Sequence, residues 1–225
     1  MKSRRVAAMC CIIVKLTASI LILGALAVLA GCATAESRLR DRADAGDAEA
    51  QYRLGTMYWM GDSVEKSPAE ALKWYQKAAQ RGHRQAQLKL AEVYESGTAV
   101  PQDYRRAAQL YERAAREGDV NAEIRLAALY VRGIGVPQNY AEARTLLERA
   151  AMQEHIEAQY LLGRMYYEGL GGPRNNVLAH MWFNLAAAKG HKEAERMRIV
   201  AATTLDAEQL MEAQKLAVVH TAGRR

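Results

Sequence analysis

The sequence predicts an all-α solenoid, a stack of helix–loop–helix units around one continuous core. Alanines recur at a step of 36 residues, at Ala50, Ala86, Ala122, Ala158 and Ala194. Columns of leucine, tyrosine and glycine that begin at Leu54, Tyr58 and Gly61 keep the same step through four units. All four prolines of the chain lie between predicted helices or at the first residue of one, and none lies in a helix interior. Sequence self-similarity with a period of this size is typical of stacked repeat proteins.

Each unit is predicted to contain a first helix (helix A), a loop with glycine, and a second helix (helix B). In the first unit Ala50 and Leu54 fall on one face at helical spacing, and Gly61 ends helix A, since glycine adopts the left-handed conformation without strain. Ser67 followed by Pro68 predicts the N-cap and the first residue of helix B. The later units place their caps at Asp103, Asn139 and Asn175.

The period also delimits the parts of the chain. The four units are predicted to span residues 47–82, 83–118, 119–154 and 155–190. Residues 38–46 align with the second half of a unit and predict an N-terminal capping helix, and residues 191–225 predict C-terminal capping helices. Such atypical ends are expected, because the terminal units of a solenoid must cover its open core.

The N-terminus is predicted to be a signal peptide (residues 1–31) followed by a lipidated tether (residues 32–37). A basic segment precedes an apolar run of 14 residues, Leu16–Leu29. This run is shorter than the roughly 20 residues that a membrane-spanning helix needs, but is typical of a signal peptide. An ordinary secretory signal or an uncleaved anchor remains the alternative.

The run ends in Leu29-Ala30-Gly31-Cys32, which resembles the lipobox of bacterial lipoproteins. This resemblance implies cleavage before Cys32 and attachment of lipid to its sulfur. In a diderm host, a residue other than aspartate after the cysteine, here Ala33, implies export to the outer membrane. The expected location is therefore the cell envelope, with the chain lipid-anchored to the outer membrane and facing the periplasm.

The repeats themselves resemble Sel1-like repeats. The resemblance is carried by residues 48–61, 71–82 and the glycine-containing loop 133–139, and it covers about residues 45–220. The related tetratricopeptide repeats have a period of about 34 residues and lack this loop. The resemblance implies a right-handed α-solenoid, a TPR-like superhelix that serves as an adaptor or scaffold in protein–protein contacts. It also implies that helix A lines the concave face.

One set of helix A positions does not follow the core pattern, because its residue types change freely between units. We expect these positions to contact a protein or peptide partner. The candidate residues are Tyr52, Thr56, Trp59, Glu92, Glu95, Tyr160, Arg164 and Tyr167. Trp59 and Tyr167 are the strongest candidates, because the fold does not need an aromatic side chain there. The set has three positions in each unit, and in the first unit these are Tyr52, Thr56 and Trp59. The alternative is that the first of the three, such as Tyr52, packs between neighbouring A helices.

Charge and cysteine content argue against several other functions. The formal net charge is +6, but four basic residues and no acidic ones lie in residues 1–31, which leaves 27 basic against 25 acidic residues. We therefore expect no nucleic-acid partner. All three cysteines precede the repeats, which excludes a cysteine-ligated metal site there. His83, His155 and His191 share a column with Asp47 and Asp119, which predicts helix caps and not a metal site.

No cofactor and no catalytic site are predicted. Residues 63–66 match the S-x-x-K motif of penicillin-recognising enzymes, but the S-D-N and K-T-G motifs that accompany it are missing. The predicted function is a lipid-anchored envelope scaffold that is not an enzyme. Two alternatives remain open: a periplasmic regulator of a signalling or secretion component, and, from another class, a cell-wall or β-lactam hydrolase.

Overall fold

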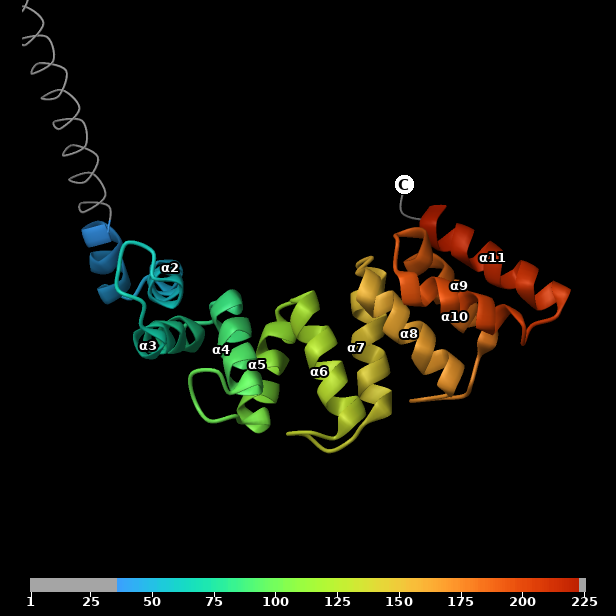
Figure 1. The fold of residues 1–225 in the computed structure, drawn as a ribbon, viewed down its shortest axis with the longest axis horizontal. Coiled ribbons are helices and arrows are strands. Elements are labelled where there is room, and N and C mark those ends of the chain that lie inside the picture. The colour runs from blue at the N-terminus through green and yellow to red at the C-terminus, as the bar shows by residue number, and fades with distance from the viewer. Residues whose placement is uncertain (1–35, 223–225) are drawn as a thin grey trace, which may run out of the picture. The chain divides into compact units, whose positions relative to one another are not determined.

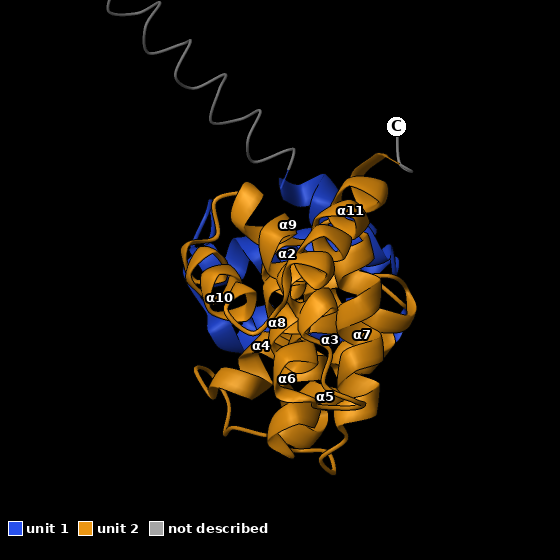
Figure 2. Cartoon of the chain, turned by 90° about the vertical axis from the view of Figure 1, so that its right-hand side faces the viewer, with its two compact units in different colours: residues 1–81 blue, residues 82–225 orange. Residues whose placement is uncertain are grey.

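The computed structural model describes residues 36–222, and every regular element in this range is a helix (Figure 1). This confirms the predicted all-α fold class. The chain divides into two compact units, Met1–Arg81 and Gly82–Arg225 (Figure 2). The predicted signal peptide and Cys32 lie outside the described residues.

Unit 1 contains a helix over residues 36–44, followed by α2 (Ala48–Met60) and α3 (Pro68–Gln80). Leu39 and Ala43 of the first helix pack with Ala50 and Leu54 of α2. This helix begins at residue 36, two residues before the predicted capping helix (residues 38–46), so it includes the last two residues of the predicted tether (residues 32–37). The segment has no glycine or proline that would stop the helix there.

Unit 2 continues the same alternation of A and B helices. Its elements are α4 (Arg84–Ser96), α5 (Tyr104–Arg116), α6 (Val120–Arg132), α7 (Tyr140–Met152), α8 (Ile156–Glu168), α9 (Asn176–Ala188), α10 (Lys192–Ala202) and α11 (Ala207–Ala222). Each helix from α4 to α9 packs against the next one along the chain, and α11 packs on α9.

The helix ends follow the predicted caps. Gly61, Gly97, Gly133 and Gly169 end the A helices with φ between 66° and 78°. The side chains of Ser67, Asp103, Asn139 and Asn175 accept a hydrogen bond from the third backbone N–H of each B helix. Each cap therefore satisfies a donor that the helix itself leaves free.

The column of histidines and aspartates caps the A helices. Asp47, His83, Asp119 and His191 each accept from the backbone N–H three residues later, while His155 makes no such bond. The cap interpretation is confirmed at these four positions. The turns before these caps use glycine with positive φ, except at Glu154, whose φ is 62°.

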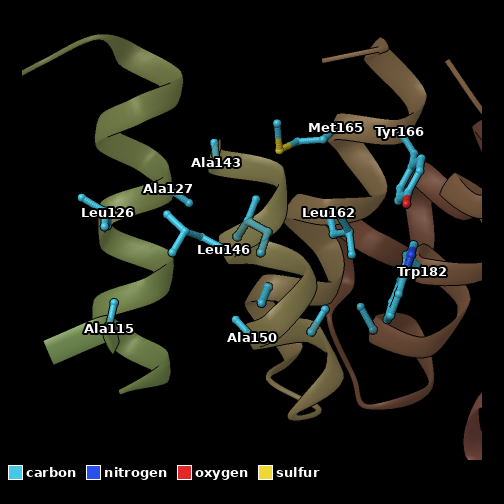
Figure 3. Packing of buried hydrophobic residues seen from close by; sticks show 14 of the residues in the cluster. Ala115, Leu126, Ala127, Ala143, Leu146, Ala150, Leu162, Met165, Tyr166 and Trp182 are labelled. Carbon is cyan, nitrogen blue, oxygen red and sulfur yellow. The ribbon is translucent and has the colours of Figure 1, made fainter. Parts of the chain in front are cut away.

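Alanine columns bring the helices of unit 2 close together. Ala107, Ala114, Ala143 and Ala150 are fully buried on the B helices. Figure 3 shows Ala127 of α6 facing Leu146 of α7, with Leu162 of α8 on the other side. This rigid packing fixes the opposite face of the A helices, where the candidate residues lie.

Candidate partner-binding surface

In unit 1 the three candidate residues form one cluster on α2, above a buried tyrosine of α3. The Tyr75 hydroxyl lies 3.2 Å from the Thr56 hydroxyl, and the rings of Tyr52 and Trp59 lie 5.7 and 6.5 Å from that of Tyr75. Tyr52, Thr56 and Trp59 are all partly buried. Trp59 is therefore less exposed than expected, because the Tyr75 ring fills the space beside it.

In α4 the two candidate glutamates are already paired within the chain. Glu92 accepts from Lys89 at 2.7 Å. Glu95 accepts from the Tyr111 hydroxyl at 2.6 Å and lies 4.0 Å from the Arg125 guanidinium of the next A helix. Burial, and then the neighbouring Glu95 carboxylate, raise the pKa of Tyr111 far above its usual value. This tyrosine is therefore a neutral donor that holds Glu95 in place.

In α8 the candidates are also supported by neighbours. The Tyr160 ring stacks on His191 at 4.4 Å, and Arg164 donates to Glu168 at 3.0 Å. The Arg174 guanidinium lies 4.8 Å from the centre of the Tyr167 ring. Tyr167 is partly buried and not fully exposed, because this arginine and the core beneath it cover part of the ring.

The third repeat, residues 119–154, contributes a pocket that we did not predict from the sequence. The cavity measures about 170 Å³ and lies between α6, α7 and α8. Its lining residues are Ala127, Ala128, Val131, Arg132, Leu147, Leu161, Arg164, Met165, Glu168 and Leu170. Ala128 and Val131 occupy the same columns as Thr56 and Trp59, so the pocket opens among the candidate positions.

The repeat pattern explains why the pocket is here. The helix B column that contains Tyr75, Tyr111 and Phe183 has a leucine, Leu147, in the third unit. Tyr75 and Phe183 lie so close to the facing helix A that a Cβ added to Gly55 or Gly163 would meet the ring at 2.7 Å. Where leucine replaces the ring, this space stays open. The single aliphatic residue in an aromatic column was the signal that could have predicted the pocket.

A buried glutamate on α6 marks a second difference between the units. In the other units the equivalent residue is glutamine; Gln51 donates to the Ala43 carbonyl at 2.9 Å and Gln159 to the Ala151 carbonyl at 3.4 Å. Glu123, with only 2% of its surface exposed, cannot donate when ionised. Arg149 of α7 binds one carboxylate oxygen at 2.8 Å, and the other oxygen has no hydrogen-bond partner.

We predict that Glu123→Gln stabilises the protein at neutral pH by about 1–2 kcal/mol, because it restores the missing donor. Burial raises the pKa of Glu123, with Asp119 adding to the effect and Arg149 opposing it. A carboxyl whose pKa is raised on folding contributes stability below its unfolded pKa of about 4.5 and loses it as pH rises through the folded pKa. The gain from Glu123→Gln should therefore shrink as pH falls from 7 towards 4.5.

Urea unfolding at several pH values measures this effect. Glu117→Gln is the control, because Glu117 is exposed and its substitution should change stability by no more than about 0.5 kcal/mol. A stability gain that is equal at pH 7 and pH 4.5, or a loss of stability in Glu123→Gln at pH 7, would contradict the prediction.

The S-x-x-K match at residues 63–66 lies in the loop between α2 and α3. Ser63 is exposed and donates to Asp62 at 3.3 Å. Within residues 36–222, no group of three metal-ligating side chains comes together. In the same range no helix combines the length and apolarity needed to cross a membrane.

Comparisons with known proteins agree with the repeat pattern. The Sel1 repeat model matches four segments, residues 48–83, 84–119, 120–155 and 156–191. Each begins one residue after the corresponding unit in the sequence analysis. No curated protein matches the chain.

Two crystal structures are similar in fold and sequence. The Sel1 repeat protein from Oxalobacter formigenes is 33% identical, with a TM-score of 0.65 over 73% of this chain and 48% of that one. A protective antigen present in uropathogenic Escherichia coli strains, which displays an SLR fold, is 26% identical, with a TM-score of 0.51 over 82% of this chain and 48% of that one. The chain thus spans about half the length of each.

Proposed function

Because this chain belongs to the Sel1 repeat family, we propose that it is a lipid-anchored scaffold of the cell envelope that binds a protein partner through its A helices. Sel1 repeats typically mediate protein–protein contacts, and that general role follows from the family. The choice of surface, the anchor and the absence of catalysis are our proposal.

One observation carries the choice of surface. The core columns that begin at Ala50 and Leu54 keep their residue type through all four repeats, whereas the columns that begin at Tyr52, Thr56 and Trp59 on helix A change from repeat to repeat. Packing between identical units favours the same residue at each repeat, but contacts with an asymmetric partner do not. Aromatic side chains, paired charges and an apolar pocket occur on these columns in different repeats, and residues of these kinds are typical of interface hot spots.

Site-specific photocrosslinking of the full-length protein in its native membrane tests this surface. A photoreactive phenylalanine analogue replaces Trp59 or Tyr167 on the A helices, or Trp74 on α3 as a matched aromatic control. Trp74 is also partly buried, but it lies on a B helix, where Lys77 covers its ring at 3.8 Å. We expect the same protein adduct from the two A-helix positions and none from Trp74. Equal adducts from Trp74, or none from either A-helix position, would reject the proposed surface.

The membrane anchor needs a separate test. We propose that Cys32 carries the lipid, which is supported by the lipobox-like sequence 29–32, and that the protein faces the periplasm from the outer membrane, which is supported by Ala33 after the cysteine. Labelled palmitate should enter the wild-type protein and the Cys11→Ala control, but not Cys32→Ala. Incorporation into Cys32→Ala at the wild-type level would disprove lipidation at this residue, and fractionation of the labelled protein identifies its membrane.

A further inference from the structure

The pocket of the third unit has features of a specific docking site. Building on the proposed function, we propose that it binds one aliphatic side chain of a partner peptide in which an acidic residue is adjacent. The occupant is thus a peptide segment that presents a leucine-sized side chain next to an aspartate or glutamate.

The size and lining of the pocket fit one aliphatic side chain. Its volume is about 170 Å³, and Leu147, Leu161 and Met165 form much of its wall. An apolar protein cavity of about 150 Å³ stays dry and binds benzene, so this space suits a single group of similar size. Water gains few hydrogen bonds there, and an apolar side chain from a partner would replace it favourably.

The helix packing of the third repeat does not require an open pocket. Tyr111 shows that an aromatic ring is accommodated in this column opposite an alanine, since Ala91 stands where the third unit has Ala127. The third unit could therefore hold a ring at Leu147 and close the pocket. It has instead a leucine there together with small residues at Ala128 and Val131, and all three differences enlarge the same space.

The charges at the rim favour an acidic neighbour. Arg164 is bound to Glu168 at 3.0 Å. Arg132 is exposed and makes no ion pair or hydrogen bond within the described part of the chain. The rim thus holds one arginine whose charge is not compensated locally. A carboxylate beside the aliphatic side chain would pair with it, whereas a basic neighbour would be repelled.

Fluorescence anisotropy with short synthetic peptides tests the proposal on the full-length protein in detergent. The probe is a labelled peptide with leucine between two aspartates, amidated at its C-terminus so that only side chains supply carboxylates. Two comparison peptides carry alanine in place of leucine, or lysines in place of the aspartates. We expect saturable binding of the probe, at least about tenfold weaker binding of the alanine peptide, and no saturable binding of the lysine peptide.

Matched variants locate the binding. Leu147→Phe restores the ring of the other units and should reduce probe affinity at least about tenfold by filling the pocket. Arg132→Glu should reduce it about fivefold through the lost ion pair. Arg105→Glu is the control, since Arg105 is another exposed arginine of unit 2 with no ion pair among the described residues, and it should bind normally. If Leu147→Phe does not fold, Ala128→Leu fills the same space from α6, at a position where other units have larger side chains.

Three results would overturn the proposal. They are the absence of saturable binding, equal affinity for the leucine and alanine peptides, and wild-type affinity in a folded pocket-filling variant. If the peptide fails to bind while Tyr167 still gives its protein adduct, the proposed surface stands and only the pocket assignment falls. If the peptide binds through the pocket and no adduct forms at Trp59 or Tyr167, the proposed partner surface is rejected and the pocket stands as a separate peptide-binding site.

Discussion

Replacing Tyr111 by alanine is expected to lower the free energy of unfolding by about 3–5 kcal/mol. The ring is completely buried on α5, and its hydroxyl donates to Glu95 on α4. Truncation leaves a cavity between the two helices and removes the donor of Glu95 as well. Urea unfolding of the purified protein, followed by circular dichroism, measures the loss.

Two further variants separate the ring from the hydroxyl. Tyr111→Phe keeps the ring and should cost only about 1 kcal/mol, the usual net value of one hydrogen bond. Gln109→Ala, an exposed position on the same helix, should change stability by no more than about 0.5 kcal/mol. If Tyr111→Ala costs less than twice as much as Tyr111→Phe, the ring is not the main support of this joint.

Gly135→Ala should destabilise the protein by at least about 2 kcal/mol, through left-handed strain and a steric clash. Gly135 has φ of +75°, and a Cβ added there would lie 2.4 Å from the Tyr104 carbonyl oxygen at the start of α5. The loop after α6 therefore lies directly against the preceding B helix. Because the obstacle is backbone, a side-chain movement cannot relieve it.

Gly118→Ala is the matched control for this clash. Gly118 has nearly the same backbone angle, φ of +81°, but nothing lies within 4 Å of an added Cβ. Its cost should be the left-handed strain alone, about 1–2 kcal/mol. Thermal or urea unfolding of both variants gives the difference, and equal losses would mean that the loop moves away from α5 at little cost.

The sequence predicted the fold well because its strongest signals act locally. A glycine at a helix end or an asparagine before a B helix determines the geometry of its own few residues, so caps such as Gly133 and Asn139 appeared where expected. The 36-residue step then requires that every unit repeat the same arrangement.

The candidate surface was predicted less completely, because it depends on contacts between residues far apart in the chain. Periodicity placed Trp59 and Glu95 in columns outside the core stripe of helix A. It could not show that the Tyr75 ring contacts Trp59 or that the Tyr111 hydroxyl donates to Glu95. Both contacts depend on how closely helix B packs against helix A. The pocket was missed for the same reason, because its volume depends on residues from α6, α7 and α8 together.

The glutamine bond at the start of helix A has a consequence for how such a chain can lengthen or shorten. The side chains of Gln51 and Gln159 each donate to a backbone carbonyl only eight residues earlier, so donor and acceptor are encoded close together in the gene. An in-frame duplication or deletion of 36 codons would leave such joints complete. Glu123 instead depends on Arg149, 26 residues further along the chain, so a recombination point between the two would separate a buried acid from its counter-ion. Selection for repeat number should therefore avoid breakpoints in that interval.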